Sequence, residues 1–213
     1  MAPQVWGTLS FAICSWFNDS NIRDKMIARD QSIRPVHFEQ ERSTFSIPIL
    51  RFSGSGVCPP RPPLRQIAIA FSGAFIAVSI LALAASATHI ALILGSFGAS
   101  CCILFGFPES PFAQPRNVIG GHFVASLTGF VFFSLFGADW WSMGLAVATS
   151  VALMLATRTA HPPAASNPVI VMLSAPAWSF LLTPTIAGAC ALVVVAVVYN
   201  NVMVGRVYPK YWL

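Results

Sequence analysis

The stretch Thr159-Ala-His-Pro-Pro-Ala-Ala-Ser166 decides the fold, because it sets a histidine and two prolines between two apolar stretches. From Gln66 to Val204, the only charged side chains are those of Glu109, Arg116, Asp139 and Arg158. Because a bilayer core strongly disfavours charged groups, the sequence predicts that this part of the chain lies in a membrane. The His-Pro-Pro break then interrupts a membrane domain.

The composition excludes an ordinary soluble domain. Hydrophobic residues make up 56% of the chain and charged residues 9%, whereas soluble domains carry about 25% charged residues. The formal charge is +5, but aromatic and basic residues are not interleaved in the way that stacking on bases requires. We therefore expect the lipid bilayer as a partner and no nucleic acid.

The fold class predicted from the apolar segments is all-α, a polytopic bundle of transmembrane helices. A helix needs about 20 residues to cross a bilayer. The fourth and fifth segments fall short of that length, so one or two segments are either broken or re-entrant. The six segments cover residues 67–86, 89–107, 118–136, 142–157, 168–182 and 185–204.

The basic residues favour six crossings with both termini in the cytoplasm. If every segment crosses, the basic residues near the spans fall on one side, as the positive-inside rule expects; a re-entrant fifth segment would place the last two on the other side. These residues are Arg61, Arg65, Arg116, Arg158, Arg206 and Lys210. Residues 1–65, which are polar and end in a Pro-rich stretch, are predicted to form a flexible leader before a membrane domain at 66–213.

The second and fifth segments share a weak internal sequence repeat. Gly98-Ala-Ser-Cys-Cys-Ile-Leu-Phe105 and Ala164-Ala-Ser-Asn-Pro-Val-Ile-Val171 share Ala-Ser, then a residue pair, then an aliphatic run. Two groups of three spans have opposite orientations, so this similarity predicts an inverted repeat in which the two segments face one another.

Three motifs in order resemble the HPP family of integral membrane proteins. They are Gly95-Ser-Phe-Gly-Ala-Ser100, the stretch from Pro108 to His122, and Thr157-Arg-Thr-Ala-His-Pro-Pro-Ala-Ala-Ser-Asn-Pro168. The resemblance covers residues 59–213 and is closest to bacterial members. It implies a compact multi-span protein of the kind described as a transporter, with plastid members linked to nitrite uptake. The chain departs from the family at Ala164-Ala165, where Gly-Ala is common.

The His-Pro-Pro stretch supplies the first candidate substrate-binding residues. The imidazole of His161 can accept and release a proton near neutral pH. The alternative is a structural role, in which His161 caps the broken helix. Pro162 and Pro163 suit the first turn of a new helix. The following amides, at Ala164 and Ser166, are therefore predicted to cradle an anion.

Four further candidate residues lie outside this stretch: Arg116, Asn117, His122 and Arg158. The guanidinium of Arg116 is suited to hold nitrite with paired hydrogen bonds. The alternative for Arg116, and also for Arg158, is that the positive charge fixes the orientation of the chain in the membrane. Asn117 is placed to cap the third span, and His122 is a secondary proton-relay candidate or a hydrogen-bonded structural histidine. We also expect Glu109 to pair with Arg116.

The glycine-rich motif supplies residues that pack helices or line a path. Small side chains at Gly95, Gly98 and Ser100 let helices approach closely. The dispersed histidines and cysteines predict no metal site and no cofactor. The sequence lacks a Ser/His/Asp set or paired carboxylates, so we expect no catalytic residues and no enzymatic activity.

The leading functional hypothesis is secondary transport of a small inorganic anion, such as nitrite, by alternating access around the broken helices. The alternative is a nontransporting membrane scaffold or assembly factor. A bacterial inner membrane is preferred over a plastid envelope on the basis of the resemblance. A homo-oligomer is compatible with either function.

Overall fold

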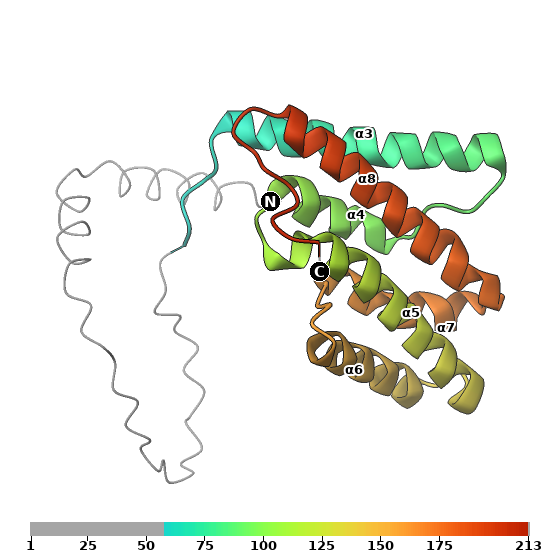
Figure 1. Ribbon diagram of the computed structural model, residues 1–213. Coiled ribbons are helices and arrows are strands. Elements are labelled where there is room, and N and C mark those ends of the chain that lie inside the picture. The colour runs from blue at the N-terminus through green and yellow to red at the C-terminus, as the bar shows by residue number, and fades with distance from the viewer. Residues whose placement is uncertain (1–57, 213) are drawn as a thin grey trace, which may run out of the picture. The chain divides into compact units, whose positions relative to one another are not determined.

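The computed structural model describes residues 58–212 and consists of helices joined by short connections (Figure 1). The predicted all-α membrane bundle is confirmed, whereas most of the predicted leader, residues 1–57, lies outside the described residues. The α-helices are α3 (Leu64–Thr88), α4 (Ser96–Cys101), α5 (Pro115–Phe136), α6 (Trp140–Ala156), α7 (Asn167–Ser174) and α8 (Ala187–Val202). Short helical turns are η1 (Cys102–Gly106), η2 (Pro111–Ala113), η3 (Pro162–Ser166), η4 (Trp178–Leu181) and η5 (Leu182–Ile186).

Three helical stretches are long and apolar enough to cross a membrane: Leu64–Thr88, Pro115–Phe136 and Trp178–Val202. The first of these, α3, turns large apolar side chains outward, with Phe71 74% and Leu83 72% exposed. Burying such surface in lipid avoids the cost of exposing it to water. The exposed face of α3 is therefore a lipid-facing surface.

The second and fifth apolar segments are broken. The second runs without helix from His89 to Gly95 and becomes helical only over Ser96–Gly106. The fifth enters through the 3-10 turn η3, where two prolines without N–H groups prevent an ordinary helix. It continues as the eight-residue α7. The number of full crossings stays a prediction.

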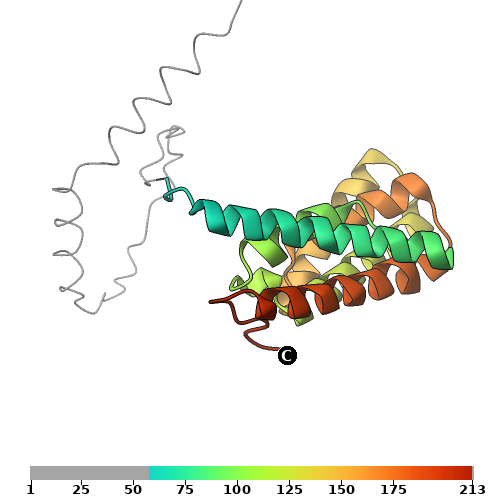
Figure 2. The same cartoon turned by 90° about the horizontal axis from the view of Figure 1, so that it is seen from above.

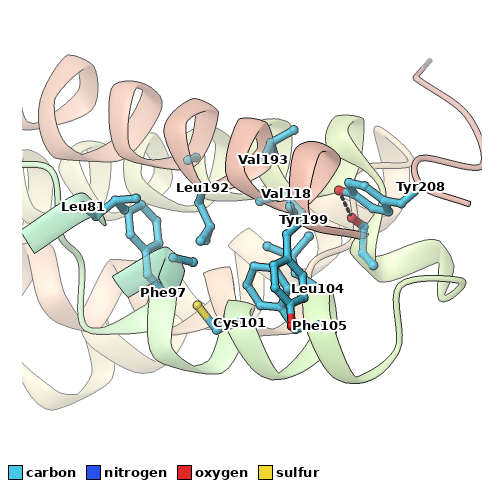
Figure 3. Packing of buried hydrophobic residues seen from close by; sticks show 14 of the residues in the cluster. Leu81, Phe97, Cys101, Leu104, Phe105, Val118, Leu192, Val193, Tyr199 and Tyr208 are labelled. Atoms are coloured by element: carbon cyan, nitrogen blue, oxygen red, sulfur yellow. Dashed lines mark hydrogen bonds between the residues drawn. The ribbon is translucent and has the colours of Figure 1, made fainter. Parts of the chain in front are cut away.

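The main hydrophobic core lies between α3, the second segment and α8 (Figures 2 and 3). Phe105 packs edge-on against Tyr199 with ring centroids 5.5 Å apart. The hydroxyl of Tyr199 donates to the Ile69 carbonyl over 2.9 Å, which ties α8 to α3. Leu104 and Leu192 are fully buried beside them. This core holds the second segment against the two long helices.

Glycines allow the closest approaches, but not those that the sequence singled out. A Cβ at Gly188 would meet the Leu92 carbonyl and the Phe97 ring, and one at Gly129 would lie 2.7 Å from Pro168 Cα. By contrast, a Cβ at Gly95 or Gly98 meets nothing within 4 Å. Gly95 and Gly98 are exposed and make no close helix contact within the described residues. Their predicted role in helix packing or path lining stays a prediction.

The basic side chains gather at one end of the bundle, here called the basic end, where α3 begins and α8 ends. Arg65 donates to the Val204 carbonyl over 3.2 Å, and Arg206 donates to the Phe105 carbonyl over 2.8 Å. Lys210 forms an ion pair with Glu109 at 3.1 Å. The predicted pairing of Glu109 with Arg116 is thus wrong, because the C-terminal tail brings a different cation to Glu109.

Candidate functional site

His161 is fully buried and fixed at the entry to the broken fifth segment. Its backbone is extended, with φ −136° and ψ 98°, and its carbonyl accepts from the Ala164 amide over 2.9 Å. On the side chain, Nδ1 lies 2.7 Å from the Phe112 carbonyl oxygen in the loop before α5. A carbonyl only accepts, so His161 carries its proton on Nδ1.

Ser100 joins His161 to a second buried histidine, His122. The Ser100 Oγ lies 2.9 Å from His161 Nε2 and 3.0 Å from His122 Nε2. The two imidazole rings are 5.0 Å apart between centroids. Ser100 comes from α4, His122 from α5 and His161 from the start of η3, so three separate segments meet at one hydroxyl group.

The hydrogen bonds in this cluster have one consistent direction when both imidazoles are neutral. His161 Nδ1 donates to Phe112, so His161 Nε2 accepts the proton of the Ser100 hydroxyl. The oxygen of Ser100 then accepts from His122 Nε2, which leaves His122 Nδ1 as an acceptor. The Ser96 carbonyl oxygen, 3.2 Å from Ser100 Oγ, is a second and more distant acceptor for the same hydroxyl proton.

Asn167, the first residue of α7, completes the row and reverses its direction. Its Nδ2 donates to His122 Nδ1 over 3.0 Å and to Ser126 Oγ over 2.9 Å. Ser126 lies 3.3 Å from the Thr185 hydroxyl in η5. We call His161, Ser100, His122, Asn167, Ser126 and Thr185 the polar row. All six are fully buried.

The polar row has a proton-exchanging part and a part that does not exchange protons. Imidazole and hydroxyl groups pass protons along hydrogen bonds. An amide nitrogen that donates on both sides, as in Asn167, accepts none. The part from His161 through Ser100 to His122 is therefore suited to hold or shift a proton, and the Asn167 nitrogen does not relay it further.

Four buried side-chain oxygens lack a partner among the described residues, and one of them, Asn167 Oδ1, belongs to the polar row. The others are Asn117 Oδ1 and the hydroxyl oxygens of Ser96 and Ser142. A buried polar atom without a partner costs about 1–3 kcal/mol. In a membrane domain, where water is scarce, such groups mark a place where a polar solute or a water molecule gains hydrogen bonds.

Arg116, Asn117 and Arg158 do not join the polar row. Arg116 donates to the Thr157 carbonyl over 2.9 Å, which satisfies the end of α6, and Asn117 donates to the Ala160 carbonyl over 2.9 Å. The helix begins at Pro115, so the expected N-cap role of Asn117 is wrong. Arg158 is exposed and adopts φ 57°.

The predicted amide cradle after the prolines is already closed in this structure. The Ala164 amide donates to His161, and the Ala164 side chain is fully buried. Ser166 turns its hydroxyl back to the Pro163 carbonyl over 2.8 Å. Pro162 is exposed and Pro163 is buried. Of the stretch proposed to bind substrate, only His161 reaches the polar row through its side chain.

Sequence reasoning missed Asn167, Ser126 and Thr185. A signal for Ser126 was present, because it follows His122 by four residues and so lies on the same helix face. Asn167 begins the helix that follows the His-Pro-Pro turn, and its side chain is buried. Thr185 lies beyond a kink at Thr183, which no local pattern announces.

Comparisons with known proteins agree with the fold. The profile of the family described as HPP, transmembrane region, matches residues 59–209. Two transmembrane proteins of Dictyostelium discoideum are similar to the chain. One is 34% identical over 172 residues, which cover 75% of this chain and 60% of the relative. The other is 29% identical over 174 residues, which cover 76% and 56%. The chain thus spans less than two thirds of each relative's length, and no solved structure matches it.

Proposed function

Because the chain belongs to the HPP transmembrane family, we propose that it is a secondary transporter of a small inorganic anion, with nitrite as the first candidate. The observation that carries this proposal is the meeting of two histidines at Ser100 inside a membrane domain. Ionisable groups buried at membrane depth are costly and are usually kept for function.

The broken helices support an alternating-access mechanism. Irregular backbone in a membrane is tolerated where it is buried in protein or lines a path. Here the break before α4 and the break before α7 lie on either side of the Ser100–His161 hydrogen bond. Rocking the first three segments against the last three would open that bond and expose the polar row to one side at a time.

In this mechanism His161 and His122 are the groups that meet the anion. Protonation of His161 at Nε2 would turn it from an acceptor into a donor, break its present bond from Ser100, and create a positive charge that attracts an anion. The proton would reach Nε2 once the rocking motion has opened the Ser100–His161 bond, because Nδ1 already carries a proton and donates to the Phe112 carbonyl. Arg116 would attract the anion to the basic end.

The basic end would face the cytoplasm under the positive-inside rule. We propose the inner membrane of a bacterial cell as the location, with both chain ends in the cytoplasm; a plastid envelope is the alternative. The Trp140 and Trp141 pair at the start of α6 would then sit at the opposite membrane boundary, where aromatic rings are favoured.

Flux in proteoliposomes tests the proposal. Purified full-length protein is reconstituted, and nitrite, nitrate and formate uptake is measured against empty liposomes with and without an inward proton gradient. We expect saturable nitrite uptake that a proton gradient accelerates. His161→Ala and Arg116→Ala should reduce it. His89→Ala is the matched control, because His89 is exposed just after α3.

The second candidate function is a nontransporting scaffold or assembly factor. It is favoured by the complete burial of the polar row, which leaves both histidines without contact to solvent in this state. Well-folded protein that carries none of the three anions under any gradient would favour this function. A homo-oligomer is compatible with both proposals, and the mass of the purified complex in detergent measures it.

A further inference from the structure

We propose that a pocket at the basic end binds a phosphate group, supplied either by a phospholipid headgroup or by a soluble phosphate compound. The pocket has a volume of about 730 Å³ and lies between the start of α3, the end of η1 and the chain after α8. Neither histidine of the polar row lines it. The proposal therefore stands apart from the proposed transport function.

Two arginines line this pocket, and each has unused donors. Arg65 uses one nitrogen on the Val204 carbonyl, and Arg206 uses one nitrogen on the Phe105 carbonyl and Asn200 Oδ1. A guanidinium has five N–H groups in a planar fork. The remaining N–H groups of Arg65 and Arg206 are available to the oxygens of a ligand, and paired N–H groups match phosphate geometry well.

The pocket carries excess positive charge. Its lining includes one acid, Glu109, and that carboxylate is already paired with Lys210 at 3.1 Å. Burial lowers the pKa of Arg206, and the neighbouring charge of Arg65 lowers it further, while Tyr199 opposes this. Among the described residues, two cations thus face one pocket with no unpaired acid in its lining, which makes a site for an anion with several oxygens.

The remaining walls suit a ligand with an apolar part. Phe107, Val204 and Val207 line the pocket and are 60%, 79% and 61% exposed. A pocket of this volume is much larger than a three-atom anion requires. Arg65 lies at the start of the apolar helix α3 and Arg206 follows the end of α8, where basic residues meet lipid phosphates. A phosphodiester with acyl chains along the apolar wall fits both features, and a soluble phosphate compound fits the arginines alone.

The test is retention of phospholipid by full-length protein in native mass spectrometry. Protein is purified from bilayers of equal phosphatidylglycerol and phosphatidylcholine, and bound lipids are counted. Arg65→Gln is the main variant, because Arg65 makes a single hydrogen bond to the backbone. Val207→Glu is the second, since it adds an acid to the pocket wall and leaves both arginines intact. Arg61→Gln is the matched control, because Arg61 is exposed at the same end and does not line the pocket.

We expect Arg65→Gln and Val207→Glu each to retain about fivefold less phosphatidylglycerol than Arg61→Gln retains, which is the effect of one direct charge contact. A soluble arm adds inorganic phosphate and glycerol 3-phosphate to lipid-depleted protein and measures thermal stability. If the protein retains lipid and the soluble phosphate compounds do not raise its thermal stability, the site binds a lipid headgroup. If these compounds do raise its thermal stability, and Arg65→Gln loses that effect, the site binds a free phosphate. Equal behaviour of Arg65→Gln, Val207→Glu and Arg61→Gln in both arms would overturn the proposal.

Discussion

Gly121 and His161 approach so closely that no side-chain atom fits between them. A Cβ at Gly121 would lie 2.7 Å from His161 Cβ and 2.8 Å from the Thr159 carbonyl oxygen. Real Cβ atoms do not approach other atoms this closely, so the absence of a side chain at Gly121 lets the His-Pro-Pro entry rest on α5. The position of the buried imidazole therefore depends on a glycine in a neighbouring helix.

Gly121→Ala should destabilise the domain and shift His161. Overpacking of this kind costs about 1–3 kcal/mol, and the Thr159 carbonyl is backbone that cannot rotate away. Thermal unfolding of the purified protein in one detergent measures the loss. Gly144→Ala is the control, because a Cβ at Gly144 in α6 meets nothing within 4 Å. Equal unfolding temperatures for the two variants would contradict the prediction.

Ser100→Ala should cost more stability than the loss of an ordinary buried serine. It removes the hydroxyl between His122 Nε2 and His161 Nε2, and each buried group left unpaired costs about 1–3 kcal/mol. The control is Ser150→Ala, because Ser150 is buried too but bonds to the Val147 carbonyl of its own helix. Thermal unfolding of both variants under the same conditions makes the comparison. A Ser100→Ala protein as stable as Ser150→Ala would show that the bridge contributes little.

Tyr208→Phe should weaken the attachment of the C-terminal tail and remove part of the alkaline sensitivity of the fold. The buried Tyr208 hydroxyl donates to the Ala113 carbonyl over 2.7 Å (Figure 3). The net loss at neutral pH should be about 0.5–1.5 kcal/mol. Burial raises the pKa of Tyr208 above its ordinary value of 10.0.

The sign of the pH effect follows from this shift. The folded state favours the neutral phenol, so this contribution is complete below about pH 10 and falls as the pH rises further. The unfolding temperature of the wild type should therefore drop more between pH 9 and pH 11, roughly the window of this transition, than that of Tyr208→Phe. Tyr211→Phe is the control, since Tyr211 is exposed. Parallel pH curves for wild type and Tyr208→Phe would refute this contribution.

Gly188→Ala should disturb the nonhelical part of the second segment, whereas Gly98→Ala should not. A Cβ at Gly188 would press on the Leu92 carbonyl and lie 2.6 Å from the Phe97 ring, while one at Gly98 meets open space. We expect a loss of about 1–3 kcal/mol for Gly188→Ala and faster proteolysis between His89 and Gly95. Limited proteolysis with mass mapping reads out the segment directly. Cleavage at the same rate in both variants would contradict the prediction.

The sequence was sufficient for the fold class because each signal is local. The charge-poor run to Val204 indicates a membrane domain, and Pro162-Pro163 marks the broken fifth segment. The chemistry of proline explains that break, since proline lacks an N–H group. The gathering of basic residues at one end was predicted from their placement in alternate connections between the apolar segments.

The candidate site was only partly predictable because it depends on contacts between distant segments. Ser100 and His161 are 61 positions apart, and the weak repeat around Ser100 predicts that the second and fifth segments face one another without identifying His161 as its partner. The same cause explains the error at Asn117, which local rules treat as a cap. Its amide instead reaches Ala160, 43 positions away, after the chain has folded back.

The reversal of hydrogen bonds at Asn167 has a consequence for the energy stored across the membrane. Asn167 donates to His122 on one side and to Ser126, halfway along α5, on the other. The Asn167 nitrogen donates on both sides and so relays no proton between His122 and Ser126. Under the proposed transport function, the histidines would change their charge without conducting protons through this nitrogen, and the host membrane would keep its potential.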